Sequence, residues 1–277
     1  GTVGVGTAPG VGFGLTTATA SIAPTVTQNT VPLQNLAGGG TVNTTYLSGR
    51  DGVVVNPFEP VLPKQIENVS VAGRVLRGVA LRGGTYSDTN GITPLTSAPT
   101  TETSRPIQSF NTEVFYPNQV WSPNFYDAID GGATRVVAIP AQFRSSSLGA
   151  IDGTLRRWTG IDLALYYLPS GWPSGSAAVR SAAVTAAPNI SGVTGSALGN
   201  QITFRVNALA DGSAGVQAVW VLYTGEPGSA FHGTWAPLDL VQDPDDPTLW
   251  TGTLTAPSAA DAAAMRFMVQ AVGGGGL

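Results

Sequence analysis

The residues able to serve as nucleophile or base are few in this chain. Its 277 residues include no Cys and one His, His232, which stands in the segment PGSAFHGTW. Hydrolases that attack with a Ser or Cys side chain normally place a His beside the nucleophile. Neither a G-x-S-x-G nor an S-x-x-K element occurs, and the Gly, Ser and Pro around His232 predict a surface turn. We therefore expect no catalytic residue and no enzymatic activity.

Three carboxylates stand close together in the segment DPDDP. Calcium takes six to eight oxygen ligands, and Asp side chains this close in sequence could supply several of them. The segment lacks the wider D-x-D-x-D-G spacing, and its prolines favour a tight turn between strands, so a solvated turn is the preferred interpretation. The candidate calcium ligands are Asp243, Asp245 and Asp246.

Glycine-rich runs occur near the start of the chain and at 273–276. A phosphate-binding loop needs a strand before it and a helix after it, so that the amide groups of the helix N-terminus meet the phosphate. Neither neighbour is predicted here. We therefore expect no nucleotide and no other organic cofactor.

An aromatic-rich segment, 115–132, is predicted to be a long loop. Its residues WSPNFY could present rings on which a sugar stacks, which would make a carbohydrate site. The alternative is that the same rings close one end of a sandwich or the seam between two domains. The candidate ligand-binding residues are Trp121, Phe125 and Tyr126.

Acceptor patterns for N-glycosylation, N-x-S/T, occur three times. They matter only in a secreted protein, in a cell that glycosylates its exports. A chain this rich in Thr and Ser also carries such patterns by chance. The candidate sites are Asn43, Asn68 and Asn189.

The composition favours an all-β protein. Charged residues make up 11% of the chain, less than half the usual share of about 25%. There are 36 Gly and 20 Pro but a single Lys, Lys64, so turns and strands are favoured over the charged outer faces of helices. A net charge of −4 without a basic stripe argues against nucleic acid. No run of 18 apolar residues is present, so we expect no transmembrane segment.

Three parts are expected along the chain. Residues 1–40, rich in Gly, Thr and Ala, predict an extended arm or edge strand that could join the sheet of another subunit. Residues 41–185 predict a first β-sandwich domain and end in a linker without periodicity. Residues 186–277 predict a second sandwich. Alternating patterns predict strands over 65–86 (two strands, ending at the Gly83-Gly84 turn), 108–116, 134–143, 154–168, 201–209, 216–224, 235–241, 249–256 and 265–272.

The second sandwich resembles a known class of module. The order VWVLYTG (219–225), GTWAPLDL (233–240), LWTGTL (249–254) and MRFMVQAV (265–272) is similar to bacterial immunoglobulin-like or fibronectin type III-like modules of secreted and surface proteins. The resemblance covers about 187–277 and implies an immunoglobulin-like fold. In those modules a further turn and strand follow the last of these phrases, whereas here GGGGL follows.

A second resemblance covers 107–168. The phrases FYPNQVW (115–121), TRVVAIPAQFR (134–144) and GTLRRWTGIDLALYY (153–167) are similar to the β-rich prodomain or accessory region of gingipain-type cysteine peptidases. The peptidase itself needs a Cys nucleophile, and this chain has no Cys. The resemblance therefore implies a non-catalytic region only.

Several functions fit these features. The leading hypothesis is an extracellular or cell-surface structural protein: a subunit of a surface layer, filament or adhesive stalk that self-associates into a homo-oligomer or polymer. The alternatives are a non-catalytic accessory or prodomain module of a secreted peptidase, and a carbohydrate-binding module with a glycan partner. A viral structural protein also remains open.

Overall fold

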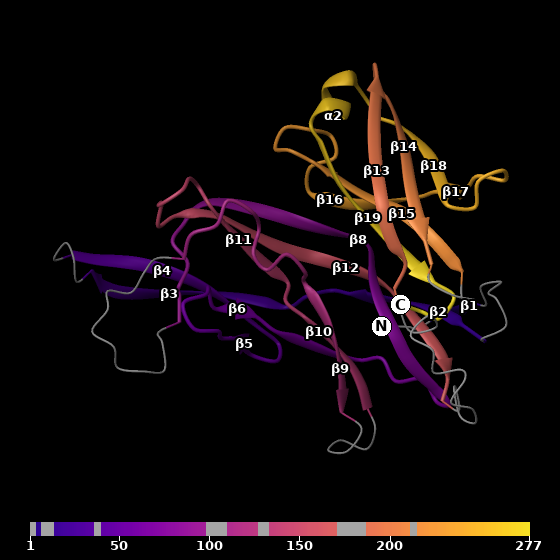
Figure 1. Ribbon diagram of the computed structural model, residues 1–277. Helices are drawn as coiled ribbons and strands as arrows, with labels where there is room; N and C mark the ends of the chain where they lie inside the picture. The colour runs from indigo at the N-terminus through magenta and orange to yellow at the C-terminus, as the bar shows by residue number, and fades with distance from the viewer. Residues whose placement is uncertain are drawn as a thin grey trace. The chain divides into compact units, whose positions relative to one another are not determined.

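The computed structural model describes residues 4–6, 14–35, 40–97, 110–126, 133–170, 187–210 and 215–277. These residues are almost entirely β-structure, with one short helix among them, which confirms the predicted all-β class (Figure 1). They group into two compact units. One unit comprises residues 1–22, 70–85 and 161–277, and the other comprises residues 23–69 and 86–160. Most of the predicted linker, 171–185, lies outside the described residues.

This grouping differs from the three consecutive parts that the sequence predicts. Residues 1–40 were expected to form an extended arm or an edge strand, and within them residues 16–22 and 26–35 lie in paired strands. Strand β2 (Thr16–Ile22) pairs antiparallel with β12 (Gly153–Pro169), and β3 (Val26–Asn35) forms a hairpin with β4 (Gly40–Gly49). The reason lies in the side chains of β2, because Thr16, Ala18 and Ile22 are buried there.

The larger sheet has the strand order β1-β2-β12-β8-β16-β15-β19. The strands not yet named are β1 (Gly4–Gly6), β8 (Arg74–Ile92), β16 (Thr234–Asp239), β15 (Val216–Gly225) and β19 (Met265–Gly273). β8 does not end at Gly83-Gly84 as predicted. Gly84 pairs with Trp235 of β16, and a Cβ on Gly83 would lie 3.0 Å from the carbonyl oxygen of Trp235. The two glycines therefore allow the close approach of a neighbouring strand.

The C-terminal residues form a two-sheet sandwich, and its likeness to immunoglobulin-like modules stays a prediction. One sheet has the order β13 (Asn189–Leu198), β14 (Gln201–Leu209), β18 (Leu249–Thr255) and β17 (Val241–Gln242). The other is the end of the larger sheet, formed by β16, β15 and β19. The core between them includes Phe204, Val221 and Trp250. Trp220, expected in this core, lies on the other face of β15, and its indole Nε1 donates to the carbonyl of Leu81, 3.1 Å away.

A single helical turn precedes the last strand. Helix α2 (Ala259–Ala263) begins at Ser258, whose hydroxyl accepts a hydrogen bond from the amide of Asp261, and whose backbone is extended. The Asp261 carboxylate in turn accepts from the Ala230 amide at 2.7 Å. This capping explains why a short helix forms at this point of the chain.

The smaller unit contains shorter sheets. A three-stranded sheet has the order β7 (Gln65–Asn68), β10 (Ala133–Ala138) and β9 (Trp121–Tyr126). β5 (Val53–Val54) pairs with β6 (Leu62–Pro63), and β11 (Ala141–Ser145) pairs with β12. Two strand predictions fail here. The strand predicted over 108–116 is a loop in its described part, and the predicted strand 134–143 is two strands, β10 and β11, separated by Ile139-Pro140.

Candidate binding site around Arg156 and Arg144

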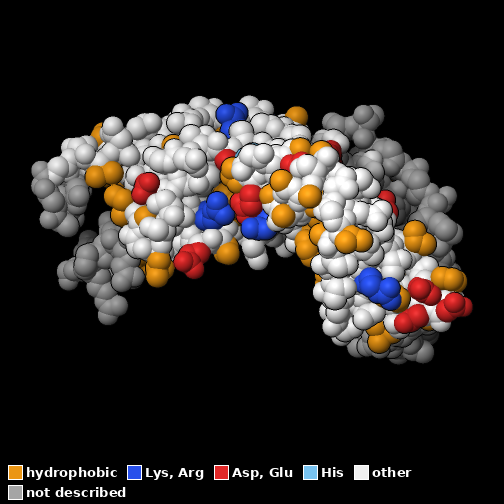
Figure 2. Space-filling model, turned by 90° about the horizontal axis from the view of Figure 1, so that it is seen from above, with side chains coloured by type: hydrophobic (Ala, Val, Ile, Leu, Met, Phe, Trp, Pro, Cys, Tyr) orange, Lys and Arg blue, Asp and Glu red, His pale blue; other side chains and the backbone are white. Residues whose placement is uncertain are grey.

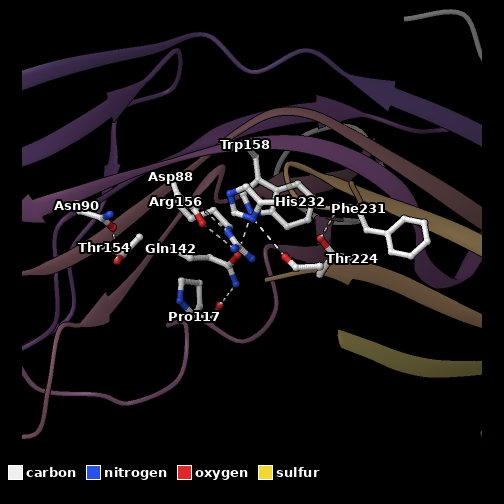
Figure 3. Close-up of polar contacts among 11 residues, drawn as sticks. Asp88, Asn90, Pro117, Gln142, Thr154, Arg156, Trp158, Thr224, Phe231 and His232 are labelled. Atoms are coloured by element: carbon white, nitrogen blue, oxygen red, sulfur yellow. Dashed lines mark hydrogen bonds and ion pairs between the residues drawn. The ribbon is translucent and has the colours of Figure 1, made fainter. Parts of the chain in front are cut away.

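Arg156 lies at the centre of the smaller unit and is nearly buried. Its guanidinium makes two hydrogen bonds to the carboxylate of Asp88, each 2.9 Å long (Figure 3). The side chains are 9% and 12% exposed. Two rings also contact the guanidinium, with Tyr86 at 3.7 Å and Phe115 at 4.0 Å from ring centroid to the guanidinium carbon. A planar, always charged group is suited to such a combination of paired and stacked contacts.

A second chain of polar contacts lies beside Arg156. The Trp158 indole donates to the Gln142 side-chain oxygen at 3.0 Å, and the Gln142 amide donates to the carbonyl of Pro117 at 2.6 Å (Figure 3). Trp158 and Gln142 are both buried. These contacts hold the segment that contains Pro117 against β11 and β12, because a buried polar group is costly unless it is hydrogen-bonded.

Tyr116 adds backbone contacts to the same assembly. Its amide donates to the carbonyl of Phe143, and the amide of Phe143 donates back, at 2.9 and 2.8 Å. The phenol of Tyr116 donates a hydrogen bond to Glu59. Burial, together with this bond, raises the pKa of Tyr116 to about 12. The ring is therefore neutral and fixed at any physiological pH.

A pocket of about 500 Å³ opens next to this cluster. Arg144 lines it, and its guanidinium lies 4.7 Å from the centroid of Phe115. Among the residues that the structure describes, Arg144 makes no ion pair. The remaining lining residues are polar or Gly: Asn90, Gly91, Glu113, Ser145, Ser146, Ser147, Asp152, Gly153 and Thr154.

Exposed apolar side chains lie in the two loops that supply this pocket. Val114 follows Glu113 and is 70% exposed, while Leu148 and Ile151 lie between Ser147 and Asp152 and are 79% and 51% exposed. Asn111 ties the two loops together, since its side-chain amide donates to the carbonyls of Ser147 and Ala150. We name the pocket and these three apolar residues the Arg144 face. An unpaired cation, a polar pocket and exposed aliphatic groups are the ingredients of a recognition surface.

The residues predicted as an aromatic ligand site are elsewhere. Trp121, Phe125 and Tyr126 belong to strand β9, which pairs with β10, so the predicted loop 115–132 is wrong over these positions. Trp121 is partly buried, and the Gln119 side chain donates to its carbonyl at 2.8 Å. The side chains of Phe125 and Tyr126, and residues 127–132, lie outside what the structure describes. A glycan site at these rings stays a prediction.

Two of the predicted calcium ligands, Asp243 and Asp246, accept hydrogen bonds from groups of their own turn. The Asp243 carboxylate accepts from the amides of Asp245 and Asp246, and the Asp246 carboxylate accepts from the amide and hydroxyl of Thr248. The bonds from Thr248 hold the pKa of Asp246 below its usual value. No group of acidic residues or His in the described parts of the chain could hold a metal ion. Local hydrogen bonds use carboxylate oxygens of Asp243 and Asp246, and calcium binding at this turn stays a prediction.

The other predicted positions lie on the surface. Asn43, Asn68 and Asn189 are all exposed, and whether they carry glycans stays a prediction. His232 lies in the turn between β15 and β16, as predicted, with its Nδ1 atom 3.2 Å from the carbonyl oxygen of Gly225. Charged groups are few on the face shown in Figure 2, in agreement with their 11% share of the sequence. Within the described ranges, no helix has both the length and the apolar character needed to cross a membrane.

Sequence reasoning missed the Arg156 cluster altogether. The signal was present in the strand GTLRRWTGIDLALYY, where Arg156 and Arg157 stand between the apolar residues Leu155 and Trp158. A charge within a buried strand requires a partner, but Asp88 lies 68 residues earlier in the chain. Only the pairing of distant strands identifies the partner.

Comparisons with known proteins give limited help. No family model and no curated protein matches the chain. The solved complex of the Porphyromonas gingivalis RgpB pro- and mature domains is 16% identical, with a TM-score of 0.39 over 59% of this chain and 82% of that chain. A structure on zymogenic latency of gingipain K from the same organism is 10% identical, with a TM-score of 0.34 over 55% of this chain and 86% of that one. At this level of agreement neither structure decides the function.

Proposed function

We propose that this chain is a non-catalytic accessory or prodomain module of a secreted peptidase, and that it holds its partner domain through the Arg144 face. The proposal places the chain outside the cell. It also implies that the catalytic Cys and His belong to a separate domain, since this chain has no Cys.

One observation carries the proposal. The three phrases that resemble gingipain-type prodomains, FYPNQVW, TRVVAIPAQFR and GTLRRWTGIDLALYY, meet in one assembly. Tyr116 of the first pairs with Phe143 of the second, and Trp158 of the third donates to Gln142 of the second. Of the Arg144 face, Arg144, Gly153 and Thr154 belong to these phrases. Val114 directly precedes the first phrase, and the loop of Leu148 lies between the second phrase and the third. A pro-domain also occurs in the RgpB complex described above, but that likeness is too low to add weight.

The chemistry of the Arg144 face suits a protein partner. Leu148, at 79% exposure, presents an aliphatic side chain beside a pocket that holds an unpaired guanidinium. Interfaces draw most of their energy from a few such anchors, with Arg enriched among them. The hydrogen bonds from Asn111 hold the loop of Leu148 in place before binding, which lowers the entropy cost of association.

The first test is the identity of the precursor. We expect the native protein, isolated and sequenced with its flanking segments, to derive from a precursor that also encodes a Cys/His peptidase domain. A complete precursor without a peptidase domain would refute the proposal.

The second test measures binding. The full chain is immobilised, and the mature peptidase domain of that precursor is passed over it in biolayer interferometry. Leu148→Asp should weaken binding at least tenfold. Val241→Asp is the matched control, because Val241 is similarly exposed, at 72%, but lies on β17 in the other unit. Equal binding by the Leu148→Asp variant and the control would exclude the Arg144 face.

The other functions stay predictions. A surface-layer, filament or stalk subunit and a carbohydrate-binding module each lack a supporting observation of comparable weight. The same holds for a viral structural protein.

A further inference from the structure

The C-terminal sandwich ends, on one side, in two strand edges. β13 is the outer strand of the sheet β13-β14-β18-β17, and β19 is the outer strand beside β15. Within the described residues, neither strand has a second neighbour. In an antiparallel ladder every second residue directs its N–H and C=O groups away from its partner. Both edges therefore present free backbone donors and acceptors.

The two edges lie next to each other. A Cβ placed on Gly195 of β13 would lie 3.4 Å from the ring of Phe267 on β19, and 3.3 Å from the ring of Phe204. The Phe267 ring packs edge-on against Phe204, with 5.1 Å between the centroids. Phe204 is fully buried on β14. Phe267 therefore reaches from one sheet edge to the core beneath the other.

The core is incompletely covered on this side. Phe267 is 41% exposed, although it lies opposite Tyr223, which packs against the core of the sandwich. Val193 of β13 is likewise 41% exposed, although it lies opposite the fully buried Val206. Directly opposed residues share one face of a sheet, so both side chains point inward. They are core side chains that no other described residue covers.

These edges also lack the usual protection. Natural proteins guard exposed edges with Lys, Pro, bulges or very short strands. β13, with the sequence NISGVTGSAL, has no charged residue and no Pro, and its one bulge lies near its start, between Ile190 and Gly192. The single charge on β19, Arg266, is paired with Glu226 at 2.8 Å. At the opposite edge of the sandwich, β17 has only two residues and borders the acidic DPDDP turn.

We propose that a second copy of this chain covers these edges, so that the protein forms a dimer through β13 and β19. A single donated strand would pair with one edge and leave the other free. A copy related by a twofold axis presents the same two edges at the same separation, so both sheets continue across one interface. No like charges meet in this arrangement, because β13 is uncharged and Arg266 is neutralised within its own chain. Val193 and Phe267 then gain the cover that they lack.

The test is the oligomeric state of the full chain in solution. Sedimentation velocity over roughly 1–100 µM should show a monomer–dimer equilibrium. Val193→Lys and Phe267→Lys place a charge at the interface and should each weaken the dimer at least tenfold. Val241→Lys is the matched control, since Val241 is 72% exposed on the opposite edge, and its dimer should be unchanged.

A second measurement uses no substitution, so its outcome does not depend on whether a variant folds. Hydrogen–deuterium exchange of the unaltered protein should show amides of β13 and β19 more protected at high than at low protein concentration. A monomer over the whole concentration range would overturn the proposal. Amide exchange rates in β13 and β19 that are the same at low and high protein concentration would also overturn it. The inference goes beyond the proposed function, and Leu148→Asp should leave the dimer intact.

Discussion

Breaking the ion pair of Arg156 and Asp88 is expected to destabilise the smaller unit severely. The Asp88→Asn variant leaves the guanidinium buried between Tyr86 and Phe115 without its countercharge. Removal of one partner from a buried pair costs about 3–5 kcal/mol, because the remaining charge stays desolvated and has no countercharge. Measured stabilities of whole domains are only about 5–15 kcal/mol.

For structural reasons, we expect the loss in free energy of unfolding to lie in the upper part of this range. Both side chains are almost inaccessible, at 9% and 12% exposure, and both hydrogen bonds are 2.9 Å long. The stacked rings shield the pair further from solvent. Exposed ion pairs contribute about 0–1 kcal/mol by comparison. The double variant Arg156→Met, Asp88→Leu should recover most of the loss, since it leaves no unpaired charge.

Urea denaturation of the unaltered protein, Arg156→Met, Asp88→Leu and the double variant gives the coupling energy in a double-mutant cycle. We expect each single variant to lose at least about 3 kcal/mol, equivalent to a fall in Tm of at least about 6 °C at about 2–4 °C per kcal/mol. The loss should hardly change between low salt and 0.5 M salt, because buried pairs are weakly screened. Single-variant losses below about 1 kcal/mol, or a loss that salt removes, would refute the description of the pair as desolvated.

Three further predictions concern the larger unit. Burial raises the pKa of Tyr166 from 10 to about 12, so its contribution to stability is present below pH 10 and is lost as the pH rises through 12. At about 1.36 kcal/mol per pKa unit, the free energy of unfolding lost from this group approaches about 2–3 kcal/mol. Urea denaturation at pH 9 and at pH 11.5 measures this loss, and Tyr166→Phe should show a smaller difference between the two pH values. Ser258→Ala removes the hydroxyl that accepts from the Asp261 amide and should cost about 1 kcal/mol, whereas Ser258→Thr should retain most of it; equal Tm values for both variants would contradict the cap. Gly78→Ala would place a methyl group against the carbonyl oxygen of Gly276, so it should lower the thermal midpoint clearly, and an unchanged midpoint would show that the C-terminal segment does not pack there.

The sequence predicted the C-terminal strands well because their patterns are local. Gln201–Leu209 alternates polar and apolar residues, and it forms β14 with the expected inward side chains Ile202, Phe204 and Val206. The prediction failed for β13, whose residues NISGVTGSAL lack a regular apolar pattern because this edge strand is largely exposed. Alternation signals a half-buried strand and is lost when both faces are exposed.

Strands buried on both faces were harder to interpret. In β12 the sequence predicts one apolar and one polar face, yet Ala164 and Tyr166 are as buried as Leu163 and Leu165. The Arg156 cluster was missed for another reason. The grouping of Asp243 with its neighbours reflects the needs of a turn, whereas the Arg156 cluster needs partners from three separate segments. Sequence distance hides the second kind of site.

One loop shows strain that the sequence did not reveal. Phe58, in NPFEP, adopts φ of 65° and is 45% exposed. A bulky residue is disfavoured in this left-handed region. Hydrogen bonds fix the loop, with the Phe58 amide donating to the carbonyl of Ser97 and the Glu59 amide to the carbonyl of Asn56, each at 3.1 Å. The hydrogen bonds of the surrounding loop therefore offset the local cost.

The pairing of β2 with β12 has a consequence for the newly made protein on the ribosome. Ser21 meets its hydrogen-bond partner Asp162 across 141 residues of intervening chain. At about 5–20 residues per second, synthesis takes roughly 7–28 s to deliver that partner. During this interval β2 has no β12 edge to join, and its Thr, Ala and Ile side chains stay open to any other strand in the cell. Efficient production of this protein therefore depends on what strand β2 contacts while the rest of the chain is being translated.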